Sequence, residues 1–282
     1  MTTEIQQPVS TQGLYKYHDV IGLLSPAGPG FSGPMAVTTG PDGMLYVANR
    51  ANPNQPDGVR ITRCTKDGDF LDQFGVWGEG PGEFIWVTDF AFSPQGEVSV
   101  ADEHSHLISV FDGERNFSRR FGEQGSGPAE LDRPSGLEFG PNGNLYVVDT
   151  LNHRVQVLTP EGEYISQWGS LGVGEGQFNR PNGIAVDLDG DIYVCDWMND
   201  RVQVFDQAGS YKDVLVGHSG MSKWGRTFLN ANPEIERKLE LASQNIELKQ
   251  RFYRPVSVHV DEDGKVYVAD CYRHRVQIYQ KL

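Results

Sequence analysis

Asn152–Val157 reads NHRVQV, and close copies of this stretch return at Asn199–Val204 (NDRVQV) and Arg273–Ile278 (RHRVQI). Each copy follows a Gly turn and an alternating strand that ends in Asp, as in Gly190–Asp196. A fixed internal period indicates one supersecondary unit that is copied around or along an axis. The repeat therefore sets the architecture before any functional motif is considered.

The turn glycine of each unit marks its position in the chain. Gly143 lies 47 residues after Gly96, and Gly190 lies 47 residues after Gly143. The outer intervals are longer, since Gly43 lies 53 residues before Gly96 and Gly264 lies 74 residues after Gly190. Within a copy the pattern reads as four short strands, and a four-stranded unit with a period in the forties is typical of a β-propeller blade. We predict one all-β propeller with five four-stranded blades, and six blades is the alternative.

The predicted organisation places a flexible segment at 1–13 and the propeller at 14–282. The blade repeats lie near 34–80, 87–130, 134–178, 181–217 and 255–282. The last copy ends after its third strand, whereas Tyr15–Gly22 resembles the fourth strand Ser210–Gly217. Residues 14–24 are therefore predicted to complete the last blade and close the ring, which removes an exposed sheet edge.

A helical insertion is predicted at 217–251. Asn232 suits the cap and Pro233 the first turn, and the apolar stripe of the helix consists of Ile235, Leu239, Ala242 and Ile246. Two interpretations stay open. The helix packs on the rim of the propeller, or it forms a lid over the mouth of the channel.

The composition restricts the partners and the cellular location. The chain has 38 acidic and 24 basic residues, a formal net charge of −14, which disfavours binding to nucleic-acid phosphates. Cys64, Cys195 and Cys271 are too far apart for zinc-ligand spacing and odd in number, so we interpret them as core residues in a reducing compartment. No apolar run of about 18 residues and no secretory leader is present. We expect a cytoplasmic protein that does not bind membranes.

The motifs of the fourth copy resemble one known family. Pro181–Gly183, Tyr193–Asp196 and Asn199–Val204 match the inner, second and third strands of the NHL-repeat β-propellers. The resemblance spans nearly the whole chain except 1–13 and 217–251. The second copy departs from it, because Val87 stands where Pro is expected and Leu107 where Arg is expected.

This resemblance implies a fold more than a function, since one fold supports unrelated activities. Members of the family bind protein or RNA, and relatives include an amidating lyase and lactonases. In the lyase, the resemblance implies zinc-ligating His directly after the inner-strand Pro. None of the matching residues in this chain is His: Met35, Thr88, Ser135, Asn182 and Val256. A zinc site of that type is therefore disfavoured.

Residues that break the repeat are the candidates for catalysis. Asp89, Glu138 and His259 come from the inner strands of three blades and share the same strand parity. If that parity faces the axis, the three side chains converge on a pocket that could bind a divalent cation or act as an acid and a base. The alternative is that each is buried against a neighbouring blade and hydrogen-bonded locally.

Aromatic residues, arginines and other polar residues in the loops at one end form the ligand-binding candidates. They are Trp86, Arg133, Arg180 and Arg254 before the inner strands, and Arg50, Glu103, His104, Trp197 and Tyr272 after the second strands. Trp, Tyr and Arg are enriched in binding hot spots, so this set suits recognition of a peptide, a glycan or a small anion. The alternative for the arginines is pairing with the acidic loops around them.

Residues repeated in every copy are assigned to structure. The Asp that ends each second strand is expected to accept hydrogen bonds from loop amides, and the Arg of the third strand is expected to bond to that Asp or to neighbouring carbonyls. The functional hypothesis is accordingly a binding or scaffold module for a protein, peptide or small ligand. The alternative is a metal-dependent lyase or hydrolase with a site in the central channel, and RNA binding ranks last.

Overall fold

The computed structural model describes residues 21, 24–25, 28–51, 58–218 and 250–281. Their strands form five antiparallel sheets, which confirms the prediction of five blades. The strands of the first two blades are β1 (Pro34–Thr39), β2 (Leu45–Asn49), β3 (Arg60–Cys64), β4 (Phe70–Phe74), β7 (Val87–Phe92), β8 (Val98–Asp102), β9 (Leu107–Phe111) and β10 (Phe117–Phe121). Those of the other three are β11 (Pro134–Phe139), β12 (Leu145–Asp149), β13 (Arg154–Leu158), β14 (Tyr164–Trp168), β15 (Pro181–Val186), β16 (Ile192–Asp196), β17 (Arg201–Phe205), β18 (Tyr211–Leu215), β19 (Pro255–Val260), β20 (Lys265–Asp270) and β21 (Arg275–Gln280).

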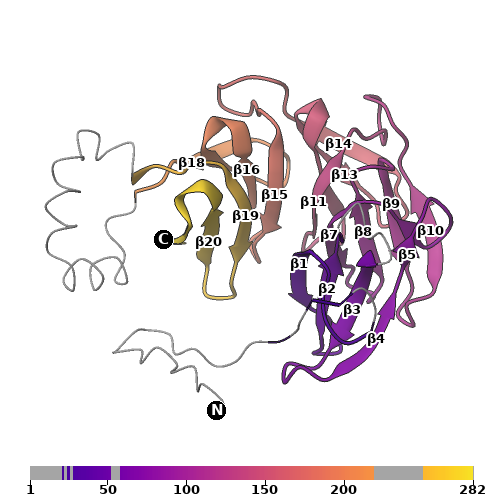
Figure 1. The fold of residues 1–282 in the computed structure, drawn as a ribbon. Helices are drawn as coiled ribbons and strands as arrows, with labels where there is room; N and C mark the ends of the chain where they lie inside the picture. The colour runs from indigo at the N-terminus through magenta and orange to yellow at the C-terminus, as the bar shows by residue number, and fades with distance from the viewer. Residues whose placement is uncertain (1–20, 22–23, 26–27, 52–57, 219–249, 282) are drawn as a thin grey trace, which may run out of the picture.

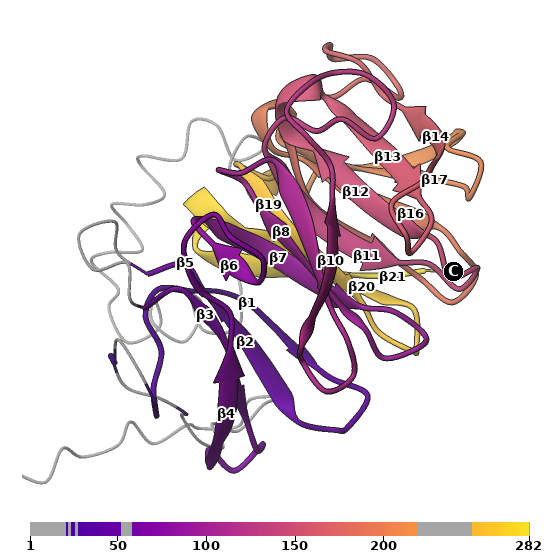
Figure 2. The same cartoon turned by 90° about the vertical axis from the view of Figure 1, so that its right-hand side faces the viewer.

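The first strand of each blade lies innermost. β1 packs beside β7, β7 beside β11, β11 beside β15 and β15 beside β19, so the blades follow one another in chain order (Figure 1). In each of the first four sheets the strands then run outward in sequence, as β1 to β4 do in Figure 2. The fifth sheet has three strands within the described residues. Short additional elements are β5 (Val76–Trp77), β6 (Glu83–Phe84) and the 3₁₀ turns η2 (Thr150–Asn152), η3 (Trp197–Asn199) and η4 (Cys271–Arg273).

A buried polar network recurs in blades three, four and five. In blade three, Arg154 Nε donates to Asp149 Oδ2 over 2.8 Å, and Asp149 Oδ1 accepts from the amide of Asp132 over 2.6 Å. The same bonds form at Arg201 and Asp196, and at Arg275 and Asp270. The repeated Asp and Arg are thus occupied in holding the second strand, the third strand and the preceding connector together, as predicted from the repeat.

The apolar core lies between neighbouring blades. On β17, Val202 and Val204 pack with Val258 of β19 and Val268 of β20. β-branched residues at alternate positions suit this arrangement because a strand presents every second side chain to one face. The core is therefore a series of interfaces between sheets that converge on the axis.

Three predictions fall mostly on residues outside the described part of the chain. These are the N-terminal segment 1–13, the completing strand at 14–24 and the helical insertion at 217–251, and they stay predictions. Among the described residues, no helix has both the length and the apolar character that a membrane crossing requires.

Candidate recognition face and central cavity

A cavity of about 600 Å³ lies where the five inner strands converge. Each of β1, β7, β11, β15 and β19 contributes to its wall. All three catalytic candidates line it: Asp89, Glu138 and His259. The five residues that follow the inner-strand Pro position line it as well, so the chain places Met, Thr, Ser, Asn and Val at the positions where the family resemblance implied His.

Asp89 projects from β7 toward the neighbouring inner strand. Its Oδ2 accepts from the amide of Leu137 on β11 over 3.1 Å, and its Oδ1 accepts from the amide of Phe90 over 2.9 Å. Burial raises the pKa of Asp89 to about 7, although both amides oppose the shift. The carboxyl group therefore links two blades and titrates near neutral pH.

Glu138 on β11 lies close enough to Asp89 for the two charges to interact. Burial and, second, the charge of Asp89 raise the pKa of Glu138 to about 8, while a 3.2 Å hydrogen bond from the amide of Phe139 opposes the shift. Two interacting carboxyl groups in a poorly solvated cavity do not ionise together readily. Near pH 7 the pair holds at least part of a proton.

His259 shares the cavity but not this pair. It is exposed on β19, and its ring centroid lies 6.2 Å from that of Tyr267. Within the described residues no group of three or more His, Cys, Asp or Glu side chains is arranged to hold a metal ion. The three candidates thus supply a carboxyl pair and a separate imidazole around one cavity.

The first part of the predicted recognition face centres on Glu103, which follows β8. Arg50 Nη2 lies 2.9 Å from Glu103 Oε2, and the Arg50 guanidinium stacks 4.9 Å from the ring centroid of Trp86. Arg133 Nη1 lies 3.4 Å from Glu103 Oε1. His104 meets Trp86 edge to face at 5.4 Å. Side chains from blades one, two and three therefore form one contiguous cluster.

The second part joins blades four and five. The guanidinium of Arg254 stacks 5.0 Å from the ring centroid of Trp197 and also contacts the Sδ atom of Met198. Tyr272 lies 5.4 Å from Tyr253, centroid to centroid, and is 57% exposed. This cluster combines aromatic surface, a cation and a thioether, and much of it is open to solvent.

Arg133, Arg180 and Arg254, which we call the rim arginines, were alternatively expected to pair with acidic loops. This holds for one of the three. Arg133 pairs with Glu103, whereas Arg254 uses Trp197 and Met198. The side chain of Arg180 is exposed and has no ion-pair partner among the described residues.

Sequence reasoning missed several members of this face. Tyr253 was not singled out, although it directly precedes Arg254, and Arg273 stacks 5.4 Å from its ring. Two histidines, His106 and His153, also escaped notice because they belong to the repeated loop. Their ring nitrogens accept from the backbone of the rim arginines Arg133 and Arg180. The signal for the tyrosine was its difference from Ile85, Asp132 and Asn179, which hold the same loop position in the second, third and fourth copies.

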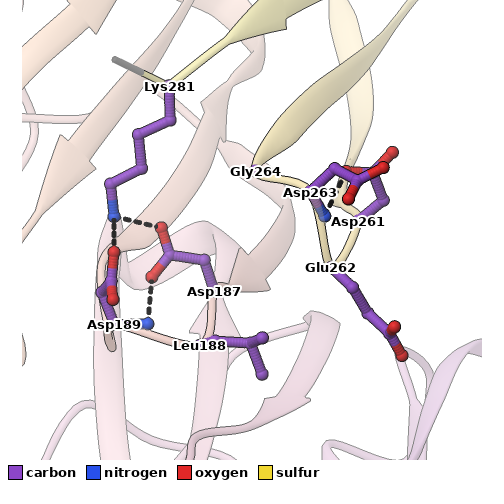
Figure 3. Close-up of a pocket in the computed structure, with 8 residues that line it drawn as sticks. All are labelled: Asp187, Leu188, Asp189, Asp261, Glu262, Asp263, Gly264 and Lys281. Atoms are coloured by element: carbon purple, nitrogen blue, oxygen red, sulfur yellow. Dashed lines mark hydrogen bonds and ion pairs between the residues drawn. The ribbon is translucent and has the colours of Figure 1, made fainter.

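A second pocket, at the turns of blades four and five, is acidic but already holds a cation of the protein itself. Lys281 Nζ lies 2.7 Å from Asp187 and 2.8 Å from Asp189 (Figure 3). It also lies 3.0 Å from Asp191. Although burial lowers it, hydrogen bonds to these carboxylates raise the pKa of Lys281. The contacts fasten the end of β21 to the turn of blade four.

Comparisons with protein families agree with this geometry. Residues 252–279 match the model of the NHL repeat, and residues 89–218 match that of the SMP-30/Gluconolactonase/LRE-like region. No curated protein matches the sequence.

Solved structures with the same fold include proteins of different kinds. Virginiamycin B lyase from Staphylococcus aureus is 13% identical, with a TM-score of 0.54, over 88% of this chain and 70% of that one. A structural genomics protein of unknown function from Bacteroides thetaiotaomicron is 20% identical, with a TM-score of 0.61, over 89% and 60%. A chain of a nidogen/laminin complex is 14% identical, with a TM-score of 0.60, over 88% and 75%. At these identities the likeness concerns the fold.

Proposed function

We propose that this β-propeller, in which residues 252–279 match the NHL-repeat model, is a binding module whose recognition face holds a protein or peptide ligand. The recognition face consists of the two loop clusters around Glu103 and around Trp197, together with the exposed side chain of Arg180. The observation that carries the proposal is the second cluster, in which the guanidinium of Arg254 stacks on the ring of Trp197 and Tyr272 is 57% exposed.

The physical argument concerns the cost of binding. Aromatic side chains and stacked guanidinium groups lose little conformational freedom when a ligand arrives, because neighbouring rings already restrict them. They also bury a large apolar area and still offer hydrogen-bond donors at their edges. A peptide with aromatic or acidic side chains suits this surface, since Arg180 is exposed and Arg254 is held over a ring.

Peptide selection tests the proposal directly. A random peptide library displayed on phage is selected on the full chain, and the affinities of the enriched peptides are measured by fluorescence polarisation. We expect Tyr272→Ala to weaken binding at least about 10-fold, as truncation of a hot-spot residue does. Tyr164→Ala is the matched control, because Tyr164 is exposed on the outer strand β14.

Two results of this selection would overturn the proposal. One is a failure to enrich any peptide above a background selection. The other is enrichment of peptides that bind Tyr272→Ala and Trp197→Ala as tightly as the unaltered chain. Circular dichroism of the variants checks that the fold is kept.

We propose a second candidate function, acid–base catalysis in the central cavity, on the strength of the Asp89 and Glu138 pair. Carboxyl groups whose pKa values lie at about 7 and about 8 can both give and accept a proton at neutral pH. In a lyase, one of them would remove a proton next to the bond that breaks and the other would protonate the leaving atom.

Virginiamycin B is a reasonable first substrate to test, because a lyase for it has the same fold. Loss of the antibiotic is followed by mass spectrometry with the unaltered chain and with Asp89→Asn and Glu138→Gln. Catalysis that disappears in both variants supports this candidate. The predicted divalent cation in the channel stays a proposal, which elemental analysis of the purified chain tests independently.

A further inference from the structure

Three arginines of the recognition face share an unusual backbone conformation. Arg133, Arg180 and Arg254 have φ angles of 57°, 51° and 62°, and each directly precedes the Pro that begins an inner strand. A left-handed conformation is unfavourable for residues other than Gly, because Cβ crowds the following carbonyl. Some other interaction must therefore hold each arginine in place.

That interaction is a hydrogen bond from the arginine amide to a side chain of the preceding blade. The amide of Arg133 donates to His106 Nδ1 over 3.1 Å, and the amide of Arg180 donates to His153 Nδ1 over 3.0 Å. At the junction of blades four and five the acceptor is instead a carboxylate, since the amide of Arg254 donates to Asp200 Oδ1 over 2.9 Å. We call these three contacts the rim latches.

The acceptors of the rim latches sit at one position of the repeat. His106, His153 and Asp200 each follow the second strand by the same loop and are themselves left-handed, with φ angles of 61°, 55° and 55°. The difference between the latches is therefore chemical and not conformational. The chain carries its own internal control, because only two of the three acceptors are imidazoles.

An imidazole can accept a hydrogen bond only while it is neutral. Protonation places a hydrogen on Nδ1, which then faces the amide hydrogen that it previously accepted. A carboxylate stays an acceptor over the pH range in which imidazoles titrate. Acidification therefore removes two latches and leaves the third.

We propose that His106 and His153 are pH-sensitive positioning residues of the recognition face: their protonation releases the backbones of Arg133 and Arg180, whereas Asp200 keeps Arg254 in place. The proposal concerns the conformation of the face and stands whether or not peptides are its ligands.

The surroundings of the two imidazoles differ in charge. Burial lowers the pKa of His153, the charge of Arg180 lowers it further, and the charges of Asp196 and Asp149 oppose this. His106 Nδ1 lies 3.4 Å from Asp132 Oδ1, which can accept from the protonated ring. The residue at the corresponding chain position beside His153 is the neutral Asn179.

Backbone amide spectra of the full chain test the proposal. ¹⁵N-labelled protein is titrated from pH 8.0 to 5.5, and the amides of Arg133, Arg180 and Arg254 are followed. We expect the first two to shift along sigmoidal curves and the third to stay in place. Three flat curves, or three equal shifts, would overturn the proposal.

Two variants separate a latch from a general loosening of the loops. His153→Asn keeps an acceptor without a titrating group, and Asn tolerates the left-handed conformation. It should abolish the transition at Arg180 and leave that at Arg133. Asp200→His should add a transition at Arg254. Two results would contradict the proposal. One is an Arg180 amide signal that still shifts with pH in His153→Asn, and the other is an Arg254 amide signal that does not shift with pH in Asp200→His.

Discussion

Val202 on β17 and Val276 on β21 occupy the same place in successive copies of the repeat, but their exposed fractions are 0% and 60%. The first packs into the junction of blades four and five. The second lies on the face of blade five that points away from blade four. The same residue in the same local structure is core in one blade and surface in the next.

Blade one shows the matching difference on its opposite face. Val37 of β1 is exposed, whereas Leu137 at the same position of β11 is buried against blade two. In the described part of the chain, no packing comparable to that of the other inner strands joins β19 to β1. The repeat therefore gives every blade apolar side chains on its faces. Whether those side chains are buried depends on whether another blade packs against that face.

The largest expected effect comes from breaking the buried polar network inside the arc of blades. Arg154→Met leaves Asp149 buried without its partner, which costs about 3–5 kcal/mol of unfolding free energy. Arg275→Met should cost less, because the Arg275 side chain is 22% exposed and that of Arg154 only 6%. Urea denaturation measures both, and equal costs would erase the distinction between the two regions.

The next effect concerns the two valines themselves. Val202→Ala removes two buried methyl groups and should cost roughly 2 kcal/mol, from lost transfer energy and the cavity that remains. Val276→Ala should change the unfolding free energy by no more than about 0.5 kcal/mol, as exposed substitutions do. If Val276→Ala costs as much as Val202→Ala, another part of the chain or a second molecule covers that face.

An effect that is smaller for each pH unit distinguishes Glu138 from His259, which hold the same position on β11 and β19. The pKa of Glu138 is raised to about 8 in the folded chain, so the folded state keeps a proton that the unfolded chain releases near pH 4. Stability from this group is therefore present at low pH and is lost as the pH rises toward 8, by at most about 1.4 kcal/mol per pH unit.

Glu138→Gln should flatten this decline and raise the melting temperature at pH 8.5 relative to the unaltered chain. His259→Gln is the matched control, because it replaces an exposed side chain at the same position of β19. Differential scanning calorimetry between pH 5 and 9 measures the slopes. A slope that Glu138→Gln does not alter would show that the cavity is well hydrated.

The smallest effect tests how the last blade is held. Lys281 ties the end of β21 to Asp187, Asp189 and Asp191 of blade four. Lys281→Met should lower the unfolding free energy by about 1 kcal/mol or less, since such partly exposed ion pairs are screened. The difference should shrink in 1 M NaCl, where the Debye length is about 3 Å. A salt-independent loss would assign the effect to packing of the Lys281 stem.

Much of the fold was predictable because short-range patterns in the sequence specify it. The Gly turns and alternating strands indicated five copies, and the recurring Asp and Arg indicated the bonds between Asp149 and Arg154. The functional surfaces were predictable only as groups of residues at one end of the ring. Stacking of Arg254 on Trp197, in place of pairing with an acid, depends on loop conformations that no period reveals.

The sequence by itself determined that the chain is a propeller, since the turns, strands and capping residues recur in five copies that lie 47 residues apart where no insertion intervenes. Only the tertiary structure decided which carboxyl groups meet, which valines are buried and which side chains hold the arginines of the recognition face. The physical reason is the same in each case. Burial, pKa and latch contacts arise between blades, and a pattern confined to one blade does not specify its neighbour.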